Sequence, residues 1–484
     1  MTKNFRSQKH AHSSHKLLAF LTSKWTFLGS LFLLLGVILP VCFYFISTVN
    51  QETIAKQKEA AEIQLIKKEQ QAHFSQNSEV KVVRAKESGK ITLQDKKIPA
   101  TVQGTTEGQF QTILKKWQMA DDDLFVSFIH LQSCAPAASK VEAGMTKYQW
   151  NIRKKTFVKQ QETKLPTNYI QTETGAPITS QLLLQNNPQN LAQIHFAVQQ
   201  ALLDQAKNPK DILDDVLAIP AFTWQTPINY RPKELTVDVA KQGMLNKTTI
   251  HLPYTASLAA SLNQAYLDPT LAQTFAAKPE ENQKQIALTF DDGPNPETTP
   301  SILNTLKAKN VHATFFQLGS NAERYPNLVK RVAEGGHEIG SHTYHHYNLP
   351  KYPRATIQKE ITDTDKAIYL ATGKLPKFIR PPYGAVNATV AEVAGRPIIQ
   401  WNIDSRDWAT KNAGKTITQV QQTITNNGII LMHDIQPSTA EALPQLIDWL
   451  TQQGYKLVTI DQLLQSQEKP YHEYFSATDE RAIS

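Results

Sequence analysis

Five short motifs rich in reactive side chains follow one another in the C-terminal part of the chain. They hold carboxylates, imidazoles and a guanidinium, which are the groups that metal-assisted hydrolysis of an amide needs for a cation, a base and an acid. Each motif alone also fits an ordinary structural role, so the chemistry rests on their occurring together. The motifs are TFDDGP from Thr289, HTYHH from His342, RPPYG from Arg380, DSRDW from Asp404 and LMHD from Leu431.

The first motif places two carboxylates beside each other after an apolar run. Asp291 and Asp292 follow IALTF and precede Gly293 and Pro294, so we expect a strand to end here. Adjacent carboxylates can then reach one centre from different directions, and one can bind a metal while the other handles protons. Because Asp, Gly and Pro are also common turn residues, a plain turn is the alternative.

The second motif carries two histidines four residues apart. One helical turn would place the imidazoles of His342 and His346 on the same side, which is a common spacing for metal ligands. With Asp292 they offer two nitrogens and one carboxylate oxygen. This set suits Zn²⁺, with Co²⁺ or Mn²⁺ as alternatives, and leaves coordination open for water and substrate. His345, between the two histidines, is expected to point elsewhere.

The third motif can support a base. Arg380 opens RPPYG after another apolar run, and a fixed guanidinium could hold the Asp291 carboxylate in two places, ionised and oriented. The two prolines stiffen the chain after them, so the backbone N–H of Tyr383 could donate to an oxyanion, a contact typically worth about 3 kcal/mol in a transition state. A rigid loop with a surface arginine is the alternative.

The last two motifs can supply an acid and a small apolar pocket. His433 ends IILMH, and Asp407 of DSRDW can fix its tautomer, which makes a general acid of the pair. Trp408 and Leu431 could wall a pocket sized for a methyl group, although each also fits an ordinary core.

The charge balance argues against a nucleic-acid partner. The chain has 484 residues, of which 40% are hydrophobic, and a formal net charge of +8. This composition suffices for ordinary folded cores. Most of the excess charge lies in an N-terminal tail without acids, so no basic stripe is expected elsewhere. The two cysteines, Cys42 and Cys134, exclude a disulfide framework. The basic residues of the tail are Lys3, Arg6, Lys9, Lys16 and Lys24.

An uncharged segment over residues 25–49 predicts a membrane anchor. As a helix it is long enough to cross a bilayer, and proline is tolerated in such helices. The basic tail, 1–24, should stay cytoplasmic, which would place the catalytic domain outside the cell, facing the wall, in a single-pass protein. A cleaved signal peptide is the alternative, but the apolar stretch is long and no small-residue cleavage site comes after it.

The rest of the chain divides by composition into four parts. Residues 50–104 are a stalk and linker, and the helix formers of the stalk with interleaved Lys and Glu do not keep the heptad of a coiled coil. Mixed alternating and helical patterns over 105–280 predict an α+β domain of unknown role. Residues 285–466 predict the catalytic domain, and 467–484 are a C-terminal tail.

The catalytic domain is predicted to be an irregular (β/α)7 barrel, so the fold class is α/β. Seven short apolar runs alternate with helical stretches, which is typical of a parallel sheet. Each motif lies at or just past the end of one run, and barrels gather their chemistry at that face. The runs are IALTF, ATFFQL, HEIGS, FIRPP, IIQWNI, GIILMH and YKLVTI.

With these motifs the region from about Gln285 to Leu464 resembles the polysaccharide deacetylases of carbohydrate esterase family 4, the NodB-homology group. Order, spacing and residue types agree throughout. The resemblance implies a base that is oriented by an arginine, an acid that is oriented by an aspartate, a metal site, an oxyanion donor and two contacts to the acetyl methyl group. In that order the residues are Asp291 with Arg380, His433 with Asp407, the ligands Asp292, His342 and His346, the Tyr383 backbone, and Trp408 with Leu431.

The anchor and middle domain resemble those of membrane-bound peptidoglycan N-acetylglucosamine deacetylases of Gram-positive bacteria. The implied function is hydrolysis of N-acetyl groups on peptidoglycan glycan strands, which releases acetate and gives lysozyme resistance. Chitin oligomers, poly-N-acetylglucosamine and acetylated xylan are alternative substrates, and a non-catalytic wall-binding protein is the alternative of another class. The choice between N-acetylglucosamine and N-acetylmuramic acid stays open.

Overall fold

In a computed structural model the chain divides into two compact units. One comprises Met1–Gln132 with Val141–Asn168, and the other comprises Ser133–Lys140 with Tyr169–Ser484. The residues interpreted above as one α+β domain, 105–280, are therefore shared between the two units. The structure describes residues 11–73, 78–84, 98–117, 119–120, 122–241, 243–276 and 283–483.

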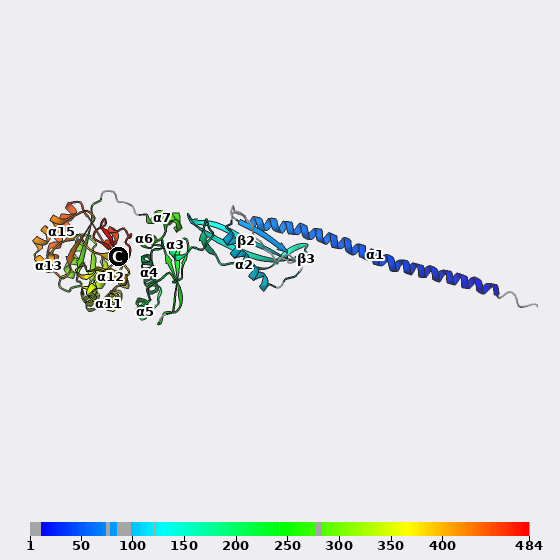
Figure 1. Ribbon diagram of the computed structural model, residues 1–484, viewed down its shortest axis with the longest axis horizontal. Helices are drawn as coiled ribbons and strands as arrows, with labels where there is room; N and C mark the ends of the chain where they lie inside the picture. The colour runs from blue at the N-terminus through cyan, green and yellow to red at the C-terminus, as the bar shows by residue number, and fades with distance from the viewer. Residues whose placement is uncertain are drawn as a thin grey trace, which may run out of the picture. The chain divides into compact units, whose positions relative to one another are not determined.

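The first unit begins with one long helix, α1 (Ala11–Ala72), which runs through Pro40 without a break. The segments interpreted above as an anchor and a stalk are thus continuous. Figure 1 shows α1 extending well beyond the sheet that its C-terminal end lies along. In its described part this helix is long and apolar enough to cross a membrane, judged by length and composition. Large apolar side chains such as Phe43 and Phe45 are exposed there.

The remainder of the first unit consists of helix α2 and most of a sheet of order β1-β2-β3-β4. Strand β5 (Asn168–Gln171), which lies almost wholly in the second unit, also pairs with β3. Leu65 of α1 packs into a small core with Leu124 and Tyr148 of the sheet, so the end of the helix belongs to this unit. The segment predicted to be a linker contains strand β1. This strand pairs with β2 along its whole length, so this part of the segment belongs to the folded unit. The elements are β1 (Ser78–Arg84), α2 (Ala100–Lys116), β2 (Asp123–Ala135), β3 (Ala138–Asn151) and β4 (Thr156–Lys164).

The second unit contains, before the barrel, an antiparallel sheet, β6-β7-β8, packed against helix α4. The amphipathic run LAQIHFAVQQALLDQ forms α4 as expected, and buries Ile194 and Val198 against Val237. Tyr369 and Leu375 of the following domain join the same core. The elements are α3 (Ser180–Leu183), α4 (Gln189–Gln205), α5 (Pro209–Leu217), β6 (Ile228–Tyr230), β7 (Glu234–Val239), β8 (Thr248–Pro253), α6 (Ala256–Ala260), η2 (Gln264–Tyr266) and α7 (Pro269–Phe275).

Parallel strands from Gln285 onward form the (β/α)7-type barrel. The main order is β11-β10-β9-β14-β13, and β15 lies beside the start of β9. Single parallel bridges join Ser341 to Ile379 and Ile379 to Ile398, which continue the ring from β11 to β12. The strands are β9 (Gln285–Asp291), β10 (Thr314–Gln317), β11 (Glu338–Ser341), β12 (Ile398–Ile399), β13 (Ile403–Asp404), β14 (Gly428–His433) and β15 (Lys456–Val458).

Two of the seven predicted runs are irregular. FIRPP forms only single bridges at Ile379 and does not extend into a strand, because Pro381 and Pro382 have no N–H to donate to a neighbouring strand. IIQWNI divides into β12 and β13, because its first half pairs with β16 (His472–Tyr474) and its second half with β14. The predicted C-terminal tail contains a hairpin of β16 and β17 (Glu480–Ala482), and so belongs to the folded domain.

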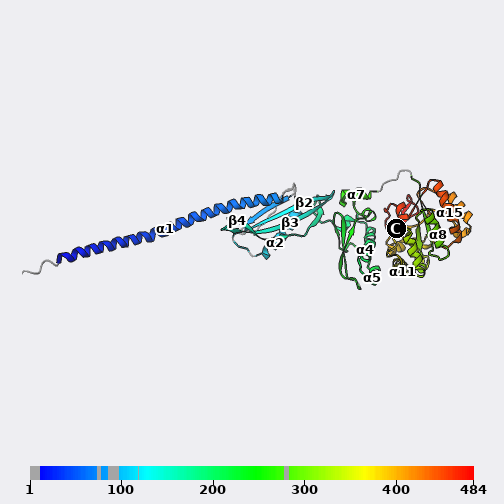
Figure 2. The ribbon, with the colours of Figure 1, turned by 180° about the vertical axis from the view of Figure 1, so that it is seen from behind.

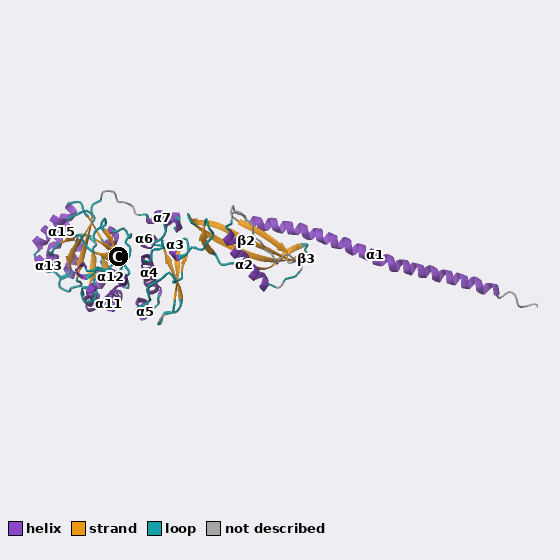
Figure 3. Cartoon of the chain, in the orientation of Figure 1, coloured by secondary structure: helices purple, strands orange, loops and turns teal. Residues whose placement is uncertain are grey.

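Helices cover the outside of the barrel, as Figure 2 shows for α8, α11 and α15, while Figure 3 shows the strands inside them. Apolar strand residues such as Phe290 and Ile430 are fully buried with Leu446 of α15. The helices are α8 (Thr299–Ala308), α9 (Gly319–Arg324), α10 (Pro326–Glu334), η3 (Leu349–Lys351), α11 (Arg354–Thr372), η4 (Pro382–Gly384), α12 (Ala388–Ala394), α13 (Asp407–Thr410), α14 (Ala413–Thr423), α15 (Pro437–Gln452) and α16 (Ile460–Leu463).

Candidate active site

All five motifs lie at the carboxyl ends of the barrel strands. β9 ends at Asp291, β14 ends at His433, and His342 directly follows β11. Arg380 follows the bridged residue Ile379, and its N–H donates to Ser341. Because these strands are parallel, segments far apart in sequence meet at one edge of the barrel.

An aspartate and two histidines form a cluster that could hold a metal ion. The Oδ1 atom of Asp292 lies 3.4 Å from Nε2 of His342 and 3.4 Å from Nε2 of His346, and the three ligand atoms lie within 4.8 Å of one another. The same Oδ1 atom is buried and has no hydrogen-bond partner among the described residues. An orphaned carboxylate oxygen facing two imidazole nitrogens fits a divalent cation.

The two histidines lie on a loop, so the expectation of one helical turn is wrong. Residues 342–348 form no helix, and both Thr343 (φ 65°) and His346 (φ 63°) are left-handed. These two inversions turn the chain so that residues four apart face the same point. Asp292 is left-handed as well, with φ 71°. Backbone strain of this kind is typical of functional sites.

Hydrogen bonds orient both imidazoles. Nδ1 of His342 lies 2.6 Å from the carbonyl oxygen of Arg380 and donates to it, which leaves Nε2 free to bind a metal. Nδ1 of His346 lies 3.2 Å from the hydroxyl of Tyr383. Burial alone would raise the pKa of Asp292, but the close approach of the His342 imidazole and the charges of the nearby histidines outweigh it and lower the pKa to about 2. The carboxylate is therefore ionised and ready to bind a cation.

Asp291 is held by a fully buried guanidinium. Nη1 of Arg380 donates to Oδ1 of Asp291 at 2.7 Å and to the hydroxyl of Thr289 at 2.8 Å. The other donors of the guanidinium reach the carbonyl oxygens of Ile399 and Gln400, each at 3.0 Å. The predicted two-point grip is therefore wrong, because one nitrogen serves the carboxylate and backbone oxygens take the rest. The second oxygen of Asp291 lies 3.8 Å from Nε2 of His342.

His433 and Asp407 form the expected pair. Nδ1 of His433 lies 2.8 Å from Oδ1 of Asp407, which is fully buried, and the backbone N–H of His433 donates to Oδ2 at 2.7 Å. Burial alone would lower the pKa of His433, but the hydrogen bond and charge of Asp407, aided by Asp291 and Asp292, raise it to about 9. A cationic imidazole at neutral pH can donate a proton.

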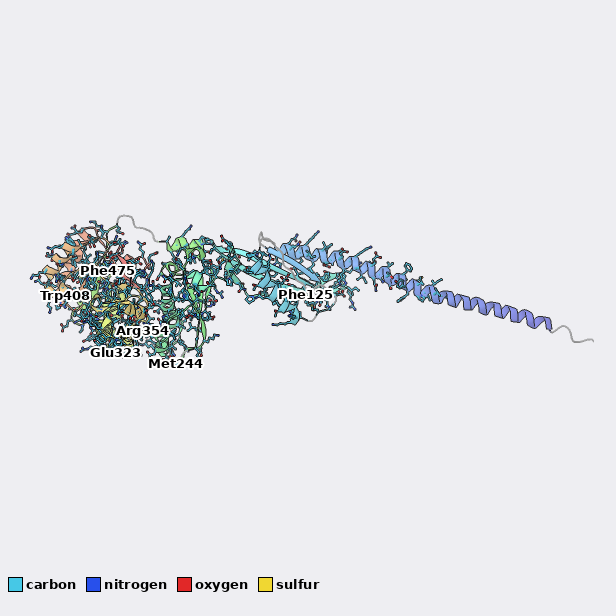
Figure 4. All side chains as sticks on the ribbon, viewed as in Figure 1. Phe125, Met244, Glu323, Arg354, Trp408 and Phe475 are labelled. Atoms are coloured by element: carbon cyan, nitrogen blue, oxygen red, sulfur yellow. The ribbon has the colours of Figure 1, made fainter. Side chains whose placement is uncertain are left out.

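The residues predicted to contact the acetyl group differ in exposure. Tyr383 is left-handed (φ 63°) and its ring is exposed, lying edge-on to His346 at 4.8 Å. Trp408 is half-exposed at the periphery of the barrel in Figure 4, and its backbone N–H donates to Oδ1 of Asp407 at 2.8 Å. Leu431 is buried. A methyl pocket between Trp408 and Leu431, and an oxyanion contact of Tyr383, stay predictions.

Several polar residues that support the site were missed from the sequence. Asn321 donates to the carbonyl of the left-handed Asp292 at 2.8 Å, and Thr439 donates to Asp407 at 2.5 Å. Glu360 accepts hydrogen bonds from the loop between the histidines. Asp434 is fully buried, and burial, followed by the charge of Asp292, raises its pKa to about 7. Asp434 stood inside a motif, whereas the others carry no local signal.

Comparisons with known proteins agree on one family. A family model described as Polysaccharide deacetylase matches residues 278–397. The chain is 36% identical over 351 residues to the peptidoglycan-N-acetylglucosamine deacetylase PgdA of Listeria monocytogenes, covering 72% of this chain and 75% of that protein. It is 33% identical over 286 residues to the peptidoglycan-N-acetylmuramic acid deacetylase PdaC of Bacillus subtilis, covering 55% and 59%. The match to a structure of PdaC has 40% identity and a TM-score of 0.38, covering 38% of this chain and 92% of that chain.

Replacement of Asp407 should change the pH range of activity. In Asp407→Asn the main group that raises the pKa of His433 loses its charge, so this pKa should fall. Because an acid must be protonated to act, the alkaline limb of kcat/KM for acetate release should move to lower pH. Asp448→Asn, an exposed position on α15, is the matched control. An alkaline limb that stays in place would remove Asp407 from this role.

Proposed function

The chain belongs to the polysaccharide deacetylase family, and from this membership we propose that it hydrolyses N-acetyl groups on the N-acetylglucosamine residues of peptidoglycan. The observation that carries the proposal is the similarity to PgdA. Its 351 aligned residues exceed the barrel, 283–483, so the likeness includes part of the chain before it. A domain shared beyond the catalytic barrel favours a shared substrate over another acetylated polymer.

The geometry supports a division of labour between two neighbouring carboxylates. Asp292, His342 and His346 would hold one divalent cation, for which Zn²⁺ is the first choice and Co²⁺ or Mn²⁺ are alternatives. When bound, this cation would polarise the acetamide carbonyl and acidify water. Asp291 is not one of these three ligands: its Oδ2 atom lies 3.8 Å from Nε2 of His342, so its carboxylate is available to accept a proton.

Asp291 would take a proton from the water that attacks the acetamide carbon. Arg380 would keep the carboxylate in place, since its guanidinium is itself held by two backbone carbonyls. The backbone N–H of Tyr383 would donate to the oxyanion. His433 would then give its proton to the departing amine, and Asp407 would stabilise the cationic imidazole before that transfer. The products are acetate and a glucosamine residue.

The N-terminal helix supports a membrane location. We infer that α1 anchors the chain with its N-terminus in the cytoplasm and its catalytic domain outside, facing the wall. Glucosamine residues carry positive charge near neutral pH, so their formation would change how lysozyme and cationic peptides meet the polymer. Lysozyme resistance is the expected consequence.

A comparison of substrates tests the function. The purified protein should release more acetate from purified peptidoglycan than from chitin oligomers or acetylated xylan at equal N- or O-acetyl content. Mass spectrometry of the digested wall should show the mass loss on N-acetylglucosamine. Loss on N-acetylmuramic acid would favour the activity named for PdaC, and a large preference for chitin oligomers would overturn the choice of peptidoglycan.

The base is tested by one isosteric change. Asp291→Asn should leave the fold and metal content unchanged, but should lower acetate release at least about 100-fold, because the amide cannot accept the proton of water. Glu297→Gln, at an exposed position six residues further on, is the control. Acetate release at the rate of the parent protein would exclude Asp291 as the base.

The metal site is tested by removing one ligand. His342→Ala should lose bound metal, measured by elemental analysis, and acetate release together, because two ligands hold a divalent cation poorly. Chelator treatment of the parent protein should have the same effect, and added Zn²⁺ should restore activity. His251→Ala, at an exposed position on β8, is the control. A His342→Ala protein that is fully active and resists chelator would refute the assignment.

A further inference from the structure

A buried carboxylate on α11 lies behind the loop that carries the two histidines. Oε2 of Glu360 accepts hydrogen bonds from the backbone N–H groups of Tyr344 at 3.0 Å and His345 at 2.8 Å. Its Oε1 atom lies 2.6 Å from Nδ1 of His345. The side chain of Glu360 is 4% exposed. Three donors from two consecutive residues thus converge on one carboxylate.

These donors come from the stretch of backbone between the two histidine ligands. Tyr344 and His345 are flanked by the left-handed residues Thr343 and His346. In such a turn successive N–H groups point into one concavity, which forms a binding site for an anion. Glu360 is the anion that fills this concavity. Without this carboxylate the backbone N–H groups of Tyr344 and His345 would be left without an acceptor, which is costly for buried donors.

The other side of the loop is tied by its carbonyl groups. The N–H groups of Gly319 and Ser320, at the start of α9, donate to the carbonyls of Thr343 at 2.9 Å and Tyr344 at 3.2 Å. The N–H of His342 is held by Gln317 at 2.9 Å. The carbonyl contacts are therefore neutral and backbone to backbone, whereas Glu360 supplies the charge-assisted contact, which is the stronger kind.

We propose that Glu360 is a positioning residue for the metal site: it holds the loop 342–346 in the conformation in which His342 and His346 face Asp292, and so sets the affinity for the divalent cation. Glu360 touches neither ligand side chain and acts through the backbone between them. The inference rests on the proposed metal site. It assigns a further buried carboxylate to the site, on a helix where sequence periodicity shows only packing.

The rest of α11 does not need this carboxylate for its packing. Ile357 and Ile361 bury their side chains in one cluster around the barrel, and Ile368 packs in another. A change at Glu360 can therefore leave the helix in place while it releases the loop. This separation makes the proposal testable by measuring metal affinity and stability in the same variants.

The experiment compares Zn²⁺ binding by metal-stripped protein before and after an isosteric change. In Glu360→Gln the negative charge is lost and only one oxygen remains to accept from the three loop donors, so the charge-assisted contacts are replaced by weaker neutral ones. The dissociation constant for Zn²⁺, measured by competition with a chromogenic chelator, should rise about 10- to 100-fold, as is usual for partners that orient metal ligands. The visible spectrum of the Co²⁺-loaded protein should also change, because the ligand geometry changes.

Controls separate positioning from general stability. Asp363→Asn, three residues further along α11, removes a carboxylate that is paired with Lys359, and should leave the affinity for Zn²⁺ unchanged. His345→Asn, at a half-exposed position, should give a smaller loss of affinity than Glu360→Gln, because it perturbs one of the three donors. This milder variant keeps the test open if Glu360→Gln does not fold.

The outcomes are distinct. Unchanged Zn²⁺ affinity in folded Glu360→Gln, or a lower melting temperature of the stripped protein with unchanged affinity, would overturn the positioning role and leave a structural one. If Glu360→Gln does not fold, unchanged affinity in His345→Asn would overturn it. If the parent protein itself binds no Zn²⁺, Co²⁺ or Mn²⁺, the proposed metal site fails, and that result differs from the failure of this inference.

Discussion

A guanidinium buried at the carboxyl end of the barrel organises the site. Moving such a charge out of water costs roughly several kcal/mol, and that cost is offset only by good pairing and hydrogen bonding. Four of the five N–H donors of Arg380 are paired, with Asp291, Thr289 and two backbone carbonyls, and its Cζ atom lies 4.1 Å from the ring centroid of Phe316. Because its partners come from β9 and from the segment around β12, the base can form only when the ring of strands has closed.

The same residue connects the base to the metal site through its backbone. The carbonyl of Arg380 accepts a hydrogen bond from Nδ1 of His342, so one residue holds the carboxylate with its side chain and the imidazole with its main chain. Left-handed backbone completes the arrangement in four of the five motifs. Asp292, Thr343, His346, Tyr383 and Arg406 all have positive φ. Such residues persist only where surrounding contacts determine their conformation.

Much of the barrel could be predicted because its signals are local. Runs such as IALTF alternate with helical segments, and the motifs at their ends must meet if the strands are parallel. The geometry of the histidine loop could not be predicted, because two histidines four residues apart can face one point either on a helical turn or on a loop with two left-handed residues. The loop donates hydrogen bonds to Glu360, and nothing in the sequence of α11 distinguishes this glutamate from other helical positions. Strand β1 was missed for a similar reason, since its pairing with β2 is long-range.

The hairpin of β16 and β17 supports the active site from behind, so the site is complete only after this hairpin has formed. The backbone N–H of Gln400 donates to the carbonyl of Tyr474 in β16 at 2.8 Å, and the side chain of Gln400 donates to Glu473 at 2.7 Å. The carbonyl of Gln400 in turn accepts a hydrogen bond from the guanidinium of Arg380. A nascent chain that has not yet produced this hairpin lacks the brace behind its central arginine. Hydrolytic capacity therefore depends on the hairpin as well as on the residues of the site, because the segment that holds Arg380 is braced only when β16 has paired.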